Sequence, residues 1–336
     1  MNIIIPMAGM GKRMRPHTLT TPKPLLPIAG KPIVQRLVED IASVCDETIE
    51  NIAFIIGPTF GKEVEADLHA IAASLGAKGH ICFQDEALGT AHAVYCAKEI
   101  LTGNVIVGFA DTLFRANFTI DPEKDGVIWV KQVEDPSAFG VVKLTEDNVI
   151  SDFIEKPETF VSDLAIIGIY YFKDGDRLKR EIEHLLDNNI RDKGEFQLTN
   201  ALENMKNDGL QFVPGEVIDW MDCGNKNATV DTNKRVLMHA GDEKMLSDTY
   251  KTVNATIIEP CFIGENVQIE HSTIGPYVSI GDNTKVTNSV ITNSIIQSNS
   301  NIKNAAFENS MVGNFVEYDG KSNQLSISDY STVKNN

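Results

Sequence analysis

The sequence has few cysteines and no long apolar run. Its 5 cysteines among 336 residues show neither metal-binding nor redox spacing, which is typical of a reduced cytoplasmic protein. No segment approaches the roughly 20 apolar residues of a membrane span. The N-terminus begins at once with a buried-strand pattern, so we expect no signal peptide. With 42% hydrophobic residues and a length sufficient for two domains, these absences predict a globular cytoplasmic protein.

Positive charge is also scarce. Lys and Arg number 30 against 47 Asp and Glu, which gives a formal net charge of −17. This charge repels nucleic acids and anionic membranes, so we expect neither as a partner. Small anionic ligands must then be bound by local positive charge. One stretch supplies it: residues 3–27 contain Lys12, Arg13, Arg15 and Lys23 and no acidic residue.

This stretch changes from a strand pattern to a glycine-rich turn. The β-branched run Ile3–Ile5 predicts a short buried strand, and Gly9 and Gly11 let the following backbone point N–H groups at an oxyanion. The spacing excludes a Walker A loop, because Lys12 is not followed by Ser or Thr. It also excludes the dinucleotide fingerprint, whose third glycine would fall at Met14.

The stretch resembles the signature of the sugar nucleotidyltransferases, G-G-x-G-T-R-L-x-P followed by P-K-P-x-x-P. The matching residues read AGMGKRMRP over 8–16 and PKPLLP over 22–27. Ala8 puts a methyl group where the signature has glycine, and Lys12 replaces threonine. The resemblance implies that Arg13 acts on a leaving pyrophosphate and Lys23 on the reacting oxygens. It also implies nucleotide contacts from Ala8, Gly9, Gly11 and Lys12.

Strand and helix patterns alternate through the first two-thirds of the chain. The alternation favours an α/β fold: a Rossmann-like nucleotidyltransferase domain with a mixed, mostly parallel sheet over residues 1–240. Because ligands bind at the carboxyl ends of parallel strands, we expect the Gly9 turn, Gln84 and Asp111 to share one crevice. The expected strands are 2–6, 52–56, 81–84, 104–110, 126–132, 140–144, 149–154 and 166–172, and the expected helices are 32–44, 62–75, 91–100, 176–188 and 197–208.

A different pattern begins near Gly241. After a linker over residues 241–251, an aliphatic residue returns every five or six positions over 252–324, with Asn, Ser and Asp between. This resembles the hexapeptide repeat of a left-handed parallel β-helix, in which aliphatic side chains fill a triangular core. Short antiparallel strands are the alternative, and the Ile-Gly pairs at Ile263, Ile274 and Ile280 weigh against it. Residues 325–336 are expected to form a polar tail.

The segment Gln84–His92 resembles the base-binding segment of the same family. There a glutamine and a glycine backbone group read the base, which implies nucleotide binding by Gln84, Gly89 and Thr90. A carboxamide offers both a donor and an acceptor to the N3–H and a carbonyl of a pyrimidine. The resemblance therefore favours UTP or dTTP over GTP.

Two aspartates stand at the metal-binding positions of the family. Asp111 follows the strand pattern of residues 105–110, and Asp222 lies in the sequence WMDCG, which matches W-x-D-x-G. One or two carboxylates together with substrate phosphates are the usual ligands of Mg²⁺. A single aspartate after a strand is more often a helix cap. Two aspartates at both motif positions instead imply that Asp111 and Asp222 bind Mg²⁺.

Three further motifs imply a sugar-phosphate site. Residues 139–141 resemble Y-G-V, residues 155–157 match E-K-P, and residues 193–200 resemble G-E-x-x-x-T-D with Asn200 in place of the final aspartate. By this resemblance Glu155 accepts hydrogen bonds from sugar hydroxyls, while Lys156, a catalytic cation, holds the sugar phosphate. The remaining residues implied for this site are Gly140, Gly168, Lys193 and Trp220.

Together the motifs imply a sugar-1-phosphate nucleotidyltransferase. An ionised oxygen of a hexose 1-phosphate attacks the α-phosphorus of UTP or dTTP in line and expels pyrophosphate, with Mg²⁺ as cofactor and without a general base. The product is a nucleotide sugar, as used in polysaccharide biosynthesis. Two alternatives stay open: a non-catalytic regulatory or assembly subunit of the same fold, and a bifunctional enzyme whose β-helix is also an acyltransferase. Solenoid faces pack readily on their own copies, so we expect a homo-oligomer.

Overall fold

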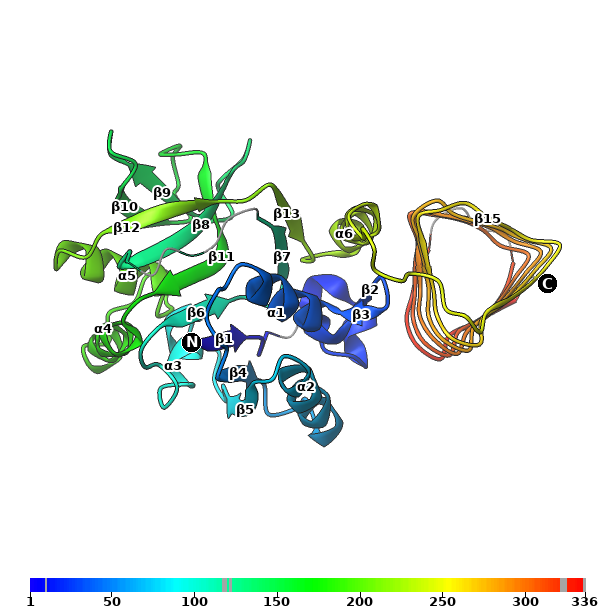
Figure 1. Ribbon diagram of the computed structural model, residues 1–336, viewed down its shortest axis with the longest axis horizontal. Helices are drawn as coiled ribbons and strands as arrows, with labels where there is room; N and C mark the ends of the chain where they lie inside the picture. Colours follow the sequence, from blue (N-terminus) through cyan, green and yellow to red (C-terminus); the bar gives the residue numbers. More distant parts are fainter. Residues whose placement is uncertain (10, 117–119, 121–122, 321–324, 335–336) are drawn as a thin grey trace. The chain divides into compact units, whose positions relative to one another are not determined.

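The computed structural model describes residues 1–9, 11–116, 120, 123–320 and 325–334 (Figure 1). Its contacts divide the chain into two compact units that do not follow chain order. The first consists of Met1–Gly9 and Leu37–Trp220, and the second of Met10–Arg36 and Met221–Asn336. The glycine-rich segment therefore belongs to the same unit as the C-terminal third of the chain. Among the described residues, no helix is both long enough and apolar enough to cross a bilayer.

Four parallel strands form the centre of the first unit. They lie in the order β6 (Val105–Gly108), β1 (Asn2–Pro6), β4 (Asn51–Ile56) and β5 (Lys78–Phe83). The side chains of the run Ile3–Ile5 are fully buried, because β1 has a neighbour on each edge and is covered on both faces. The alternation in the sequence thus correctly predicted this parallel block.

The rest of the nine-stranded sheet is mixed. β11 (Leu164–Phe172) runs antiparallel to β6 and to β8 (Gly126–Gln132), and β12 (Phe212–Glu216) runs parallel to β8. β9 (Gly140–Leu144) pairs antiparallel with β10 (Ile150–Glu155) and with β11. Two further short strands are β7 (Thr112–Arg115) and β13 (Asp219–Asp222).

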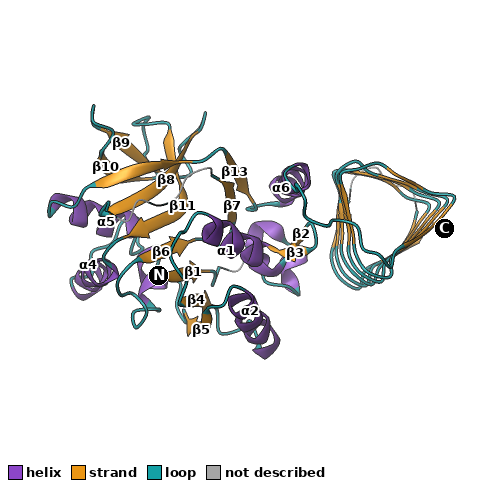
Figure 2. Cartoon of the chain, in the orientation of Figure 1, coloured by secondary structure: helices purple, strands orange, loops and turns teal. Residues whose placement is uncertain are grey.

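Helices cover the sheet of the first unit. α2 (Lys62–Ser74) packs on β5, whereas α3 (Thr90–Tyr95), α4 (Gly175–Asp187) and α5 (Leu198–Asn207) pack against one another (Figure 2). The sequence of α4 shows why a helix forms there. Asp174 caps the first turn by accepting the Arg177 N–H at 2.9 Å, and the apolar stripe of the helix is buried. α1 (Ile33–Ser43) spans the boundary between the two units in sequence.

The C-terminal part of the second unit is a parallel β-helix. Figure 1 shows its coils stacked with a triangular outline. Its three ladders are β14-β17-β20-β23-β26-β28, β15-β18-β21-β24 and β16-β19-β22-β25-β27. The strands are β14 (Lys251–Val253), β15 (Thr256–Ile257), β16 (Cys261–Ile263), β17 (Gln268–Glu270), β18 (Thr273–Ile274), β19 (Val278–Ile280), β20 (Lys285–Thr287), β21 (Val290–Thr292), β22 (Ile295–Ile296), β23 (Asn301–Lys303), β24 (Ala306–Glu308), β25 (Met311–Val312), β26 (Glu317–Asp319), β27 (Ser326–Ile327) and β28 (Thr332–Lys334). All these pairs are parallel, as the aliphatic repeat predicted, and the architecture is that expected of a left-handed β-helix.

Aliphatic side chains fill the inside of the β-helix and asparagines form its corners. Ile263, Ile269 and Ile274 are among the fully buried residues of this core. The corner residue Asn288 has φ 50°, in the left-handed region, and its Nδ2 donates to Oδ1 of Asn304, one coil further on, at 2.6 Å. Asparagine tolerates this backbone region better than most residues and adds a ladder of carboxamides along the corner.

The β-helix extends into the region where the sequence predicted a polar tail. β27 pairs in parallel with β25, and β28 pairs with β26. The prediction rested on the polar composition after Leu325. β27 and β28 are short strands that extend an already formed stack, so they leave little strand pattern in the sequence. Residues 326–334 therefore continue the solenoid.

The glycine-rich segment of the second unit folds into three short 3₁₀ turns and a small hairpin. The turns are η1 (Lys12–Met14), η2 (His17–Leu19) and η3 (Lys23–Leu25), and the hairpin pairs β2 (Pro27–Ile28) with β3 (Lys31–Pro32). α6 (Lys226–Met238) joins this segment to the β-helix: its buried Asn233 accepts the Ala29 N–H at 3.0 Å and the Ser279 hydroxyl at 2.7 Å. One buried carboxamide thus links the three parts of this unit.

Candidate active site

Asp111 lies just beyond the carboxyl end of β6. The Phe109 N–H donates to the Gly168 carbonyl at 3.0 Å, and the Ala110 N–H donates to the Pro6 carbonyl at 3.4 Å. These bonds tie the turn before Asp111 to β11 on one side and to the end of β1 on the other. The half-buried Asp111 is therefore held at the sheet edge where folds of this kind bind ligands.

Ala8, Gly9 and Gln84 leave the sheet at the same edge. The Met7 N–H bonds to the Ile55 carbonyl at 2.8 Å before the chain turns away at Ala8 and Gly9. Gln84 directly follows β5, the next strand along. The structure thus brings the Gly9 turn, Gln84 and Asp111 to one edge of the sheet.

The segment predicted to bind the base, Gln84–His92, is hydrogen-bonded to the residues that precede α5. The Phe196 N–H donates to the Leu88 carbonyl at 2.8 Å, and the Ala91 N–H donates to the Phe196 carbonyl at 2.9 Å. Gly89 between them has φ 115°, and a Cβ there would lie 2.5 Å from the Phe196 carbonyl oxygen. Only glycine fits this turn.

The Thr90 hydroxyl is already engaged within the protein. It accepts the Leu198 N–H at 2.9 Å and donates to Oε1 of the buried Gln197 at 3.1 Å. Gln197 and Phe196 were not singled out from the sequence, since only their place in the fold reveals that they hold Thr90 and Gly89. Nucleotide binding by Thr90 itself stays a prediction.

Two contacts of its amide nitrogen fix the orientation of the Gln84 side chain. Its Nε2 lies 3.3 Å from the Gly89 carbonyl oxygen and 3.1 Å from Nδ1 of His92. Burial lowers the pKa of His92, and the carboxylate of Glu86 opposes this effect. A contact between His92 and Gln84 was not predicted from the sequence, because a histidine early in a helix has no distinctive spacing.

The residues predicted for the sugar phosphate form a second cluster in the first unit. Gly140 pairs with Glu155 across β9 and β10, and a Cβ at Gly140 would lie 3.1 Å from Oε2 of Glu155. The same Oε2 accepts the Thr199 hydroxyl at 3.2 Å, and Oε1 lies 3.4 Å from Nζ of Lys156. The Lys193 ammonium donates to the Lys156 carbonyl at 2.7 Å. One carboxylate and two ammonium groups thus gather around a small glycine.

Trp220 and Gly168 occupy different surroundings. The Trp220 ring lies edge to face with Phe139, with centroids 5.0 Å apart, so it stands beside the Gly140 turn. Gly168, with φ 86°, lies in the irregular part of β11 and contacts the turn that leads to Asp111. The structure therefore brings Trp220 to the cluster predicted for the sugar phosphate and Gly168 to the end of β6.

The basic signature residues belong to the second unit. Gly11 has φ 57°, and a Cβ there would lie 2.9 Å from Cβ of Lys23, so the turn requires glycine to pack against that lysine. Its carbonyl accepts the Thr18 hydroxyl at 2.8 Å. Lys12 and Arg13 follow on an exposed 3₁₀ turn. The segment is thus a closed turn that carries exposed positive charge.

Asp222 lies in the same unit as Arg13. The Gly224 N–H donates to Oδ1 of Asp222 at 2.8 Å. A Cβ on Gly224 would lie 2.9 Å from that oxygen and 3.1 Å from Nη2 of Arg13. The glycine of the W-x-D-x-G motif therefore leaves room for a carboxylate and a guanidinium to approach the same turn.

The last coil of the β-helix holds the signature segment in place. Nε2 of the buried His17 lies 3.1 Å from the Ser326 hydroxyl, and the Ser328 hydroxyl donates to the Pro16 carbonyl at 3.1 Å. The Thr20 hydroxyl donates to Asp329 at 2.7 Å. Residues about 310 positions apart in sequence thus fix the turn that follows Arg13.

The two aspartates fit the chemistry of a magnesium site. Both offer hard carboxylate oxygens, Asp111 half-buried at the sheet edge and Asp222 exposed on its turn. The described part of the chain contains no group of three or more His, Cys, Asp or Glu side chains arranged around a metal. An ion on either aspartate would therefore complete its ligand shell with substrate phosphates and water.

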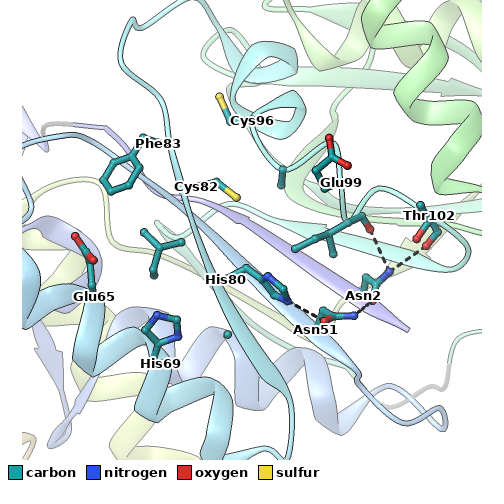
Figure 3. Close-up of a pocket in the computed structure, with 14 residues that line it drawn as sticks. Asn2, Asn51, Glu65, His69, His80, Cys82, Phe83, Cys96, Glu99 and Thr102 are labelled. Carbon is teal, nitrogen blue, oxygen red and sulfur yellow. Dashed lines mark hydrogen bonds between the residues drawn. The ribbon is translucent and has the colours of Figure 1, made fainter.

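A separate hollow lies along β5 and contains none of the residues predicted for catalysis or binding. Its volume is about 710 Å³, and Figure 3 shows its lining side chains. His80 projects from β5 and bonds through Nε2 to Oδ1 of Asn51 at 2.9 Å, and Asn51 in turn donates to Asn2. Asn2 donates onward to the backbone carbonyls of Ile100 and Thr102 at 3.1 Å. This chain of hydrogen bonds lies at the start of β1, away from its carboxyl end.

The fold and these clusters define a nucleotide-binding α/β protein that carries a β-helix. Residues 2–239 match the family described as "Nucleotidyl transferase". The chain therefore belongs to the nucleotidyl transferase family, as its signature predicted.

Two relatives agree with this assignment. The chain is 30% identical over 344 residues to a glucose-1-phosphate thymidylyltransferase of Streptomyces antibioticus, covering 94% of this chain and 93% of that one. It is 30% identical over 277 residues to a bifunctional protein GlmU of Methanococcus maripaludis, covering 82% of this chain but only 61% of that one.

Two solved structures share the fold. A UDP-glucose pyrophosphorylase complexed with UDP-glucose matches with a TM-score of 0.57 and 22% identity, covering 71% of this chain and 98% of that one. A nucleoside-diphosphate-sugar pyrophosphorylase from Vibrio cholerae matches with a TM-score of 0.59 and 22% identity, covering 69% and 99%.

Proposed function

We propose that this chain transfers a nucleotidyl group from dTTP or UTP to a hexose 1-phosphate and releases pyrophosphate. The observation that carries the proposal is a continuous hydrogen-bonded connection within the first unit. The segment with Gln84 and Gly89 is bonded to residues 196–198, and the next residue, Thr199, bonds to Glu155 of the sugar cluster. A base-reading segment and a sugar-holding cluster are thus tied together, as synthesis of a nucleotide sugar requires. The names of the relatives, thymidylyltransferase and pyrophosphorylase, support the same reaction.

The reaction needs positioning and positive charge more than proton transfer. An oxygen of the sugar phosphate forms a bond to the α-phosphorus while the bond from that phosphorus to the β-phosphate oxygen breaks, and pyrophosphate leaves. Lys156 holds the attacking phosphate, with Lys193 beside it. Lys23 neutralises the reacting oxygens, and Arg13 stabilises the leaving pyrophosphate. The attacking oxygen is already ionised at neutral pH, so no side chain has to remove a proton.

Magnesium is part of the proposal. Asp111 and Asp222 would hold the ion, which supplies positive charge to phosphate oxygens when bound. The carboxylate of Glu155 takes a different role: with its Oε2 already accepting from Thr199, it orients toward sugar hydroxyls as a hydrogen-bond acceptor.

Pyrophosphate release tests the proposal. Purified protein with Mg²⁺ is assayed with UTP, dTTP, GTP, CTP and ATP, each against a panel of hexose and hexosamine 1-phosphates. We expect release with UTP or dTTP and a hexose 1-phosphate. Tight nucleotide binding without any release would contradict catalysis and favour the regulatory-subunit alternative.

The GlmU relatives motivate a second candidate activity, acyl transfer by the β-helix. The chain spans 61% of the length of that relative, and His271 at a β-helix corner is the histidine available there as a base. Release of CoA from acetyl-CoA with amino-sugar phosphates would support this activity, and its absence would exclude it. The five free cysteines support a reducing cytoplasm as the location, and light scattering would test whether the chain is a homo-oligomer.

A further inference from the structure

We propose that His92 is a positioning residue, which fixes the Gln84 carboxamide so that its oxygen, rather than its nitrogen, meets the base. The inference rests on the proposed function, since it concerns which nucleotides that site accepts. It assigns to His92 a role in selecting bases that carry an N–H at the position read by Gln84.

The orientation of the Gln84 amide follows from its two neighbours. The Gly89 carbonyl oxygen can only accept a hydrogen bond, so the atom 3.3 Å from it must be the amide nitrogen. The same nitrogen lies 3.1 Å from Nδ1 of His92. An amide nitrogen has two hydrogens and no acceptor capacity, so Nδ1 must be the acceptor. His92 is therefore neutral and protonated on Nε2.

The surroundings of His92 favour this neutral form. The residue is half-buried in the first turns of α3, whose first residue, Thr90, is held by Leu198 and Gln197. Burial lowers the pKa of His92, which keeps the imidazole neutral near pH 7, while Glu86 acts in the opposite direction. The imidazole and the Gly89 carbonyl are thus both acceptors, and both hydrogens of the Gln84 amide are engaged.

The carboxamide oxygen is consequently the end that faces a ligand. Among the residues that the structure describes, none donates a hydrogen bond to Oε1 of Gln84. An acceptor at this place suits the N3–H of uracil or thymine. It opposes the unprotonated N3 of cytosine, because two acceptors then face each other and neither is satisfied. The geometry therefore predicts selection of UTP and dTTP against CTP, enforced by His92 through Gln84.

Nucleotide binding to variants tests this role. The dissociation constants of UTP, dTTP and CTP are measured by calorimetry without sugar phosphate. In His92→Leu the acceptor is lost, so the Gln84 carboxamide can flip and exchange the positions of its oxygen and nitrogen. The preference for UTP over CTP should then fall about tenfold or more. His92→Asn keeps an acceptor oxygen close to the position of Nδ1 and should restore most of the preference.

His80→Leu is the matched control. It removes a half-buried histidine of the same unit that bonds to Asn51 and not to Gln84, as Figure 3 shows. This variant should keep the preference for UTP over CTP of the unaltered protein. Loss of the preference in His80→Leu to the same degree as in His92→Leu would overturn the inference, because a general loosening of the unit would then explain both.

A measurement on the unaltered protein does not depend on how the variants fold. Nitrogen chemical shifts of labelled histidine distinguish the two neutral tautomers. We expect His92 near pH 7 to carry its proton on Nε2, with Nδ1 unprotonated. A proton on Nδ1 would overturn the inference, because that nitrogen cannot then accept from Gln84.

The outcomes separate this inference from the proposed function. If the protein releases pyrophosphate but binds CTP as well as UTP, or if His92→Leu leaves the preference unchanged, the inference fails and the proposed function stands. If no nucleoside triphosphate binds, the proposed function fails and the inference fails with it.

Discussion

Arg13 of the signature approaches the same turn as Asp222 and Gly224 of the W-x-D-x-G motif. The glycine is required because a Cβ would crowd both the Asp222 carboxylate and the Arg13 guanidinium. The sequence motif identified the aspartate, but the reason for the glycine appears only when residue 13 is seen beside residue 224. The motifs thus predict the site residues, and the fold explains why a glycine follows Asp222 two positions later.

Substitution of Arg13 by alanine should abolish turnover without unfolding the protein. Arg13 is exposed, so its loss costs little stability, whereas loss of a charge that stabilises the leaving pyrophosphate should lower kcat by at least about 100-fold. Pyrophosphate release and thermal unfolding measure the two effects. Asp111→Asn should reduce turnover in the same way.

Arg15→Ala is the control for this prediction. Arg15 is an exposed cation of the same segment, at a variable position of the signature. It should keep turnover close to that of the unaltered protein. Near-normal rates in Arg13→Ala would contradict the role given to Arg13.

Among the elements, α6 and the β-helix differ in how readily the sequence predicts them. The β-helix was predicted because each aliphatic residue enters the core on its own, so the repeat is visible without tertiary information. α6 was not predicted, because its buried face includes Thr232 and Asn233. The Thr232 hydroxyl bonds to the Asp222 carbonyl, and Oδ1 of Asn233 bonds to Ala29 and Ser279, which lie elsewhere in the chain.

The asparagine corners of the β-helix should stabilise it measurably. In Asn288→Ala the left-handed backbone loses a tolerant residue and the bond to Asn304 is lost, so we expect a destabilisation of about 2 kcal/mol. In Asn288→Gly the backbone is relaxed and only the bond is lost, so the loss should be smaller. Thermal unfolding midpoints rank the two variants, and an alanine variant as stable as the glycine variant would refute the argument.

The contact between the signature segment and the last coil should make stability depend on pH. Burial lowers the pKa of His17 from 6.5 to about 4; Asp329 opposes this and Lys226 adds to it. Below pH 6.5 the unfolded chain binds a proton that the folded chain does not, so the folded state loses stability as pH falls, by up to about 3 kcal/mol near pH 4.

His17→Gln isolates this effect from the titration of other groups. The variant keeps a polar side chain beside Ser326 but cannot titrate. The unfolding midpoint of the unaltered protein should fall more steeply than that of the variant between about pH 7 and about pH 4.5. Parallel slopes would show that His17 does not contribute.

Across the whole chain, the last coil of the β-helix contacts the segment around His17. Ser326, Ser328 and Asp329 bond to the segment around His17, which follows the basic turn near the N-terminus. Met10–Arg36 and Met221–Asn336 therefore form one compact unit. A division of the chain at residue 240, as the change of sequence pattern suggests, does not describe these contacts.

A chain that ends at Gly320 should lose activity through the signature segment. It lacks β27 and β28 and with them the hydrogen bonds to Pro16, His17 and Thr20, so the turn that carries Arg13 is held less firmly. We expect KM for the nucleoside triphosphate to rise about tenfold or more, because three hydrogen bonds to this segment are lost. Steady-state kinetics measures it.

Two serine variants sharpen this test. Ser328→Ala removes a bond to the Pro16 carbonyl, whereas Ser331→Ala removes a bond that stays within the coil. The first should raise KM for the nucleotide and the second should not. Equal effects would mean that the last coil acts only through general stability.

The α/β domain, the β-helix and the family could be predicted from the amino-acid sequence, because strand periodicity, aliphatic repeats and signature spacing are local properties. The direction of a strand relative to its neighbours is not a local property. Nothing in residues 164–172 indicates that β11 pairs antiparallel with β6. Only the folded chain shows that Thr90 bonds to Leu198, that His92 bonds to Gln84 and that the last coil bonds to the signature segment. Each of these depends on a hydrogen-bond partner that is distant in sequence or hidden in a helix, and such a partner leaves no pattern in the chain.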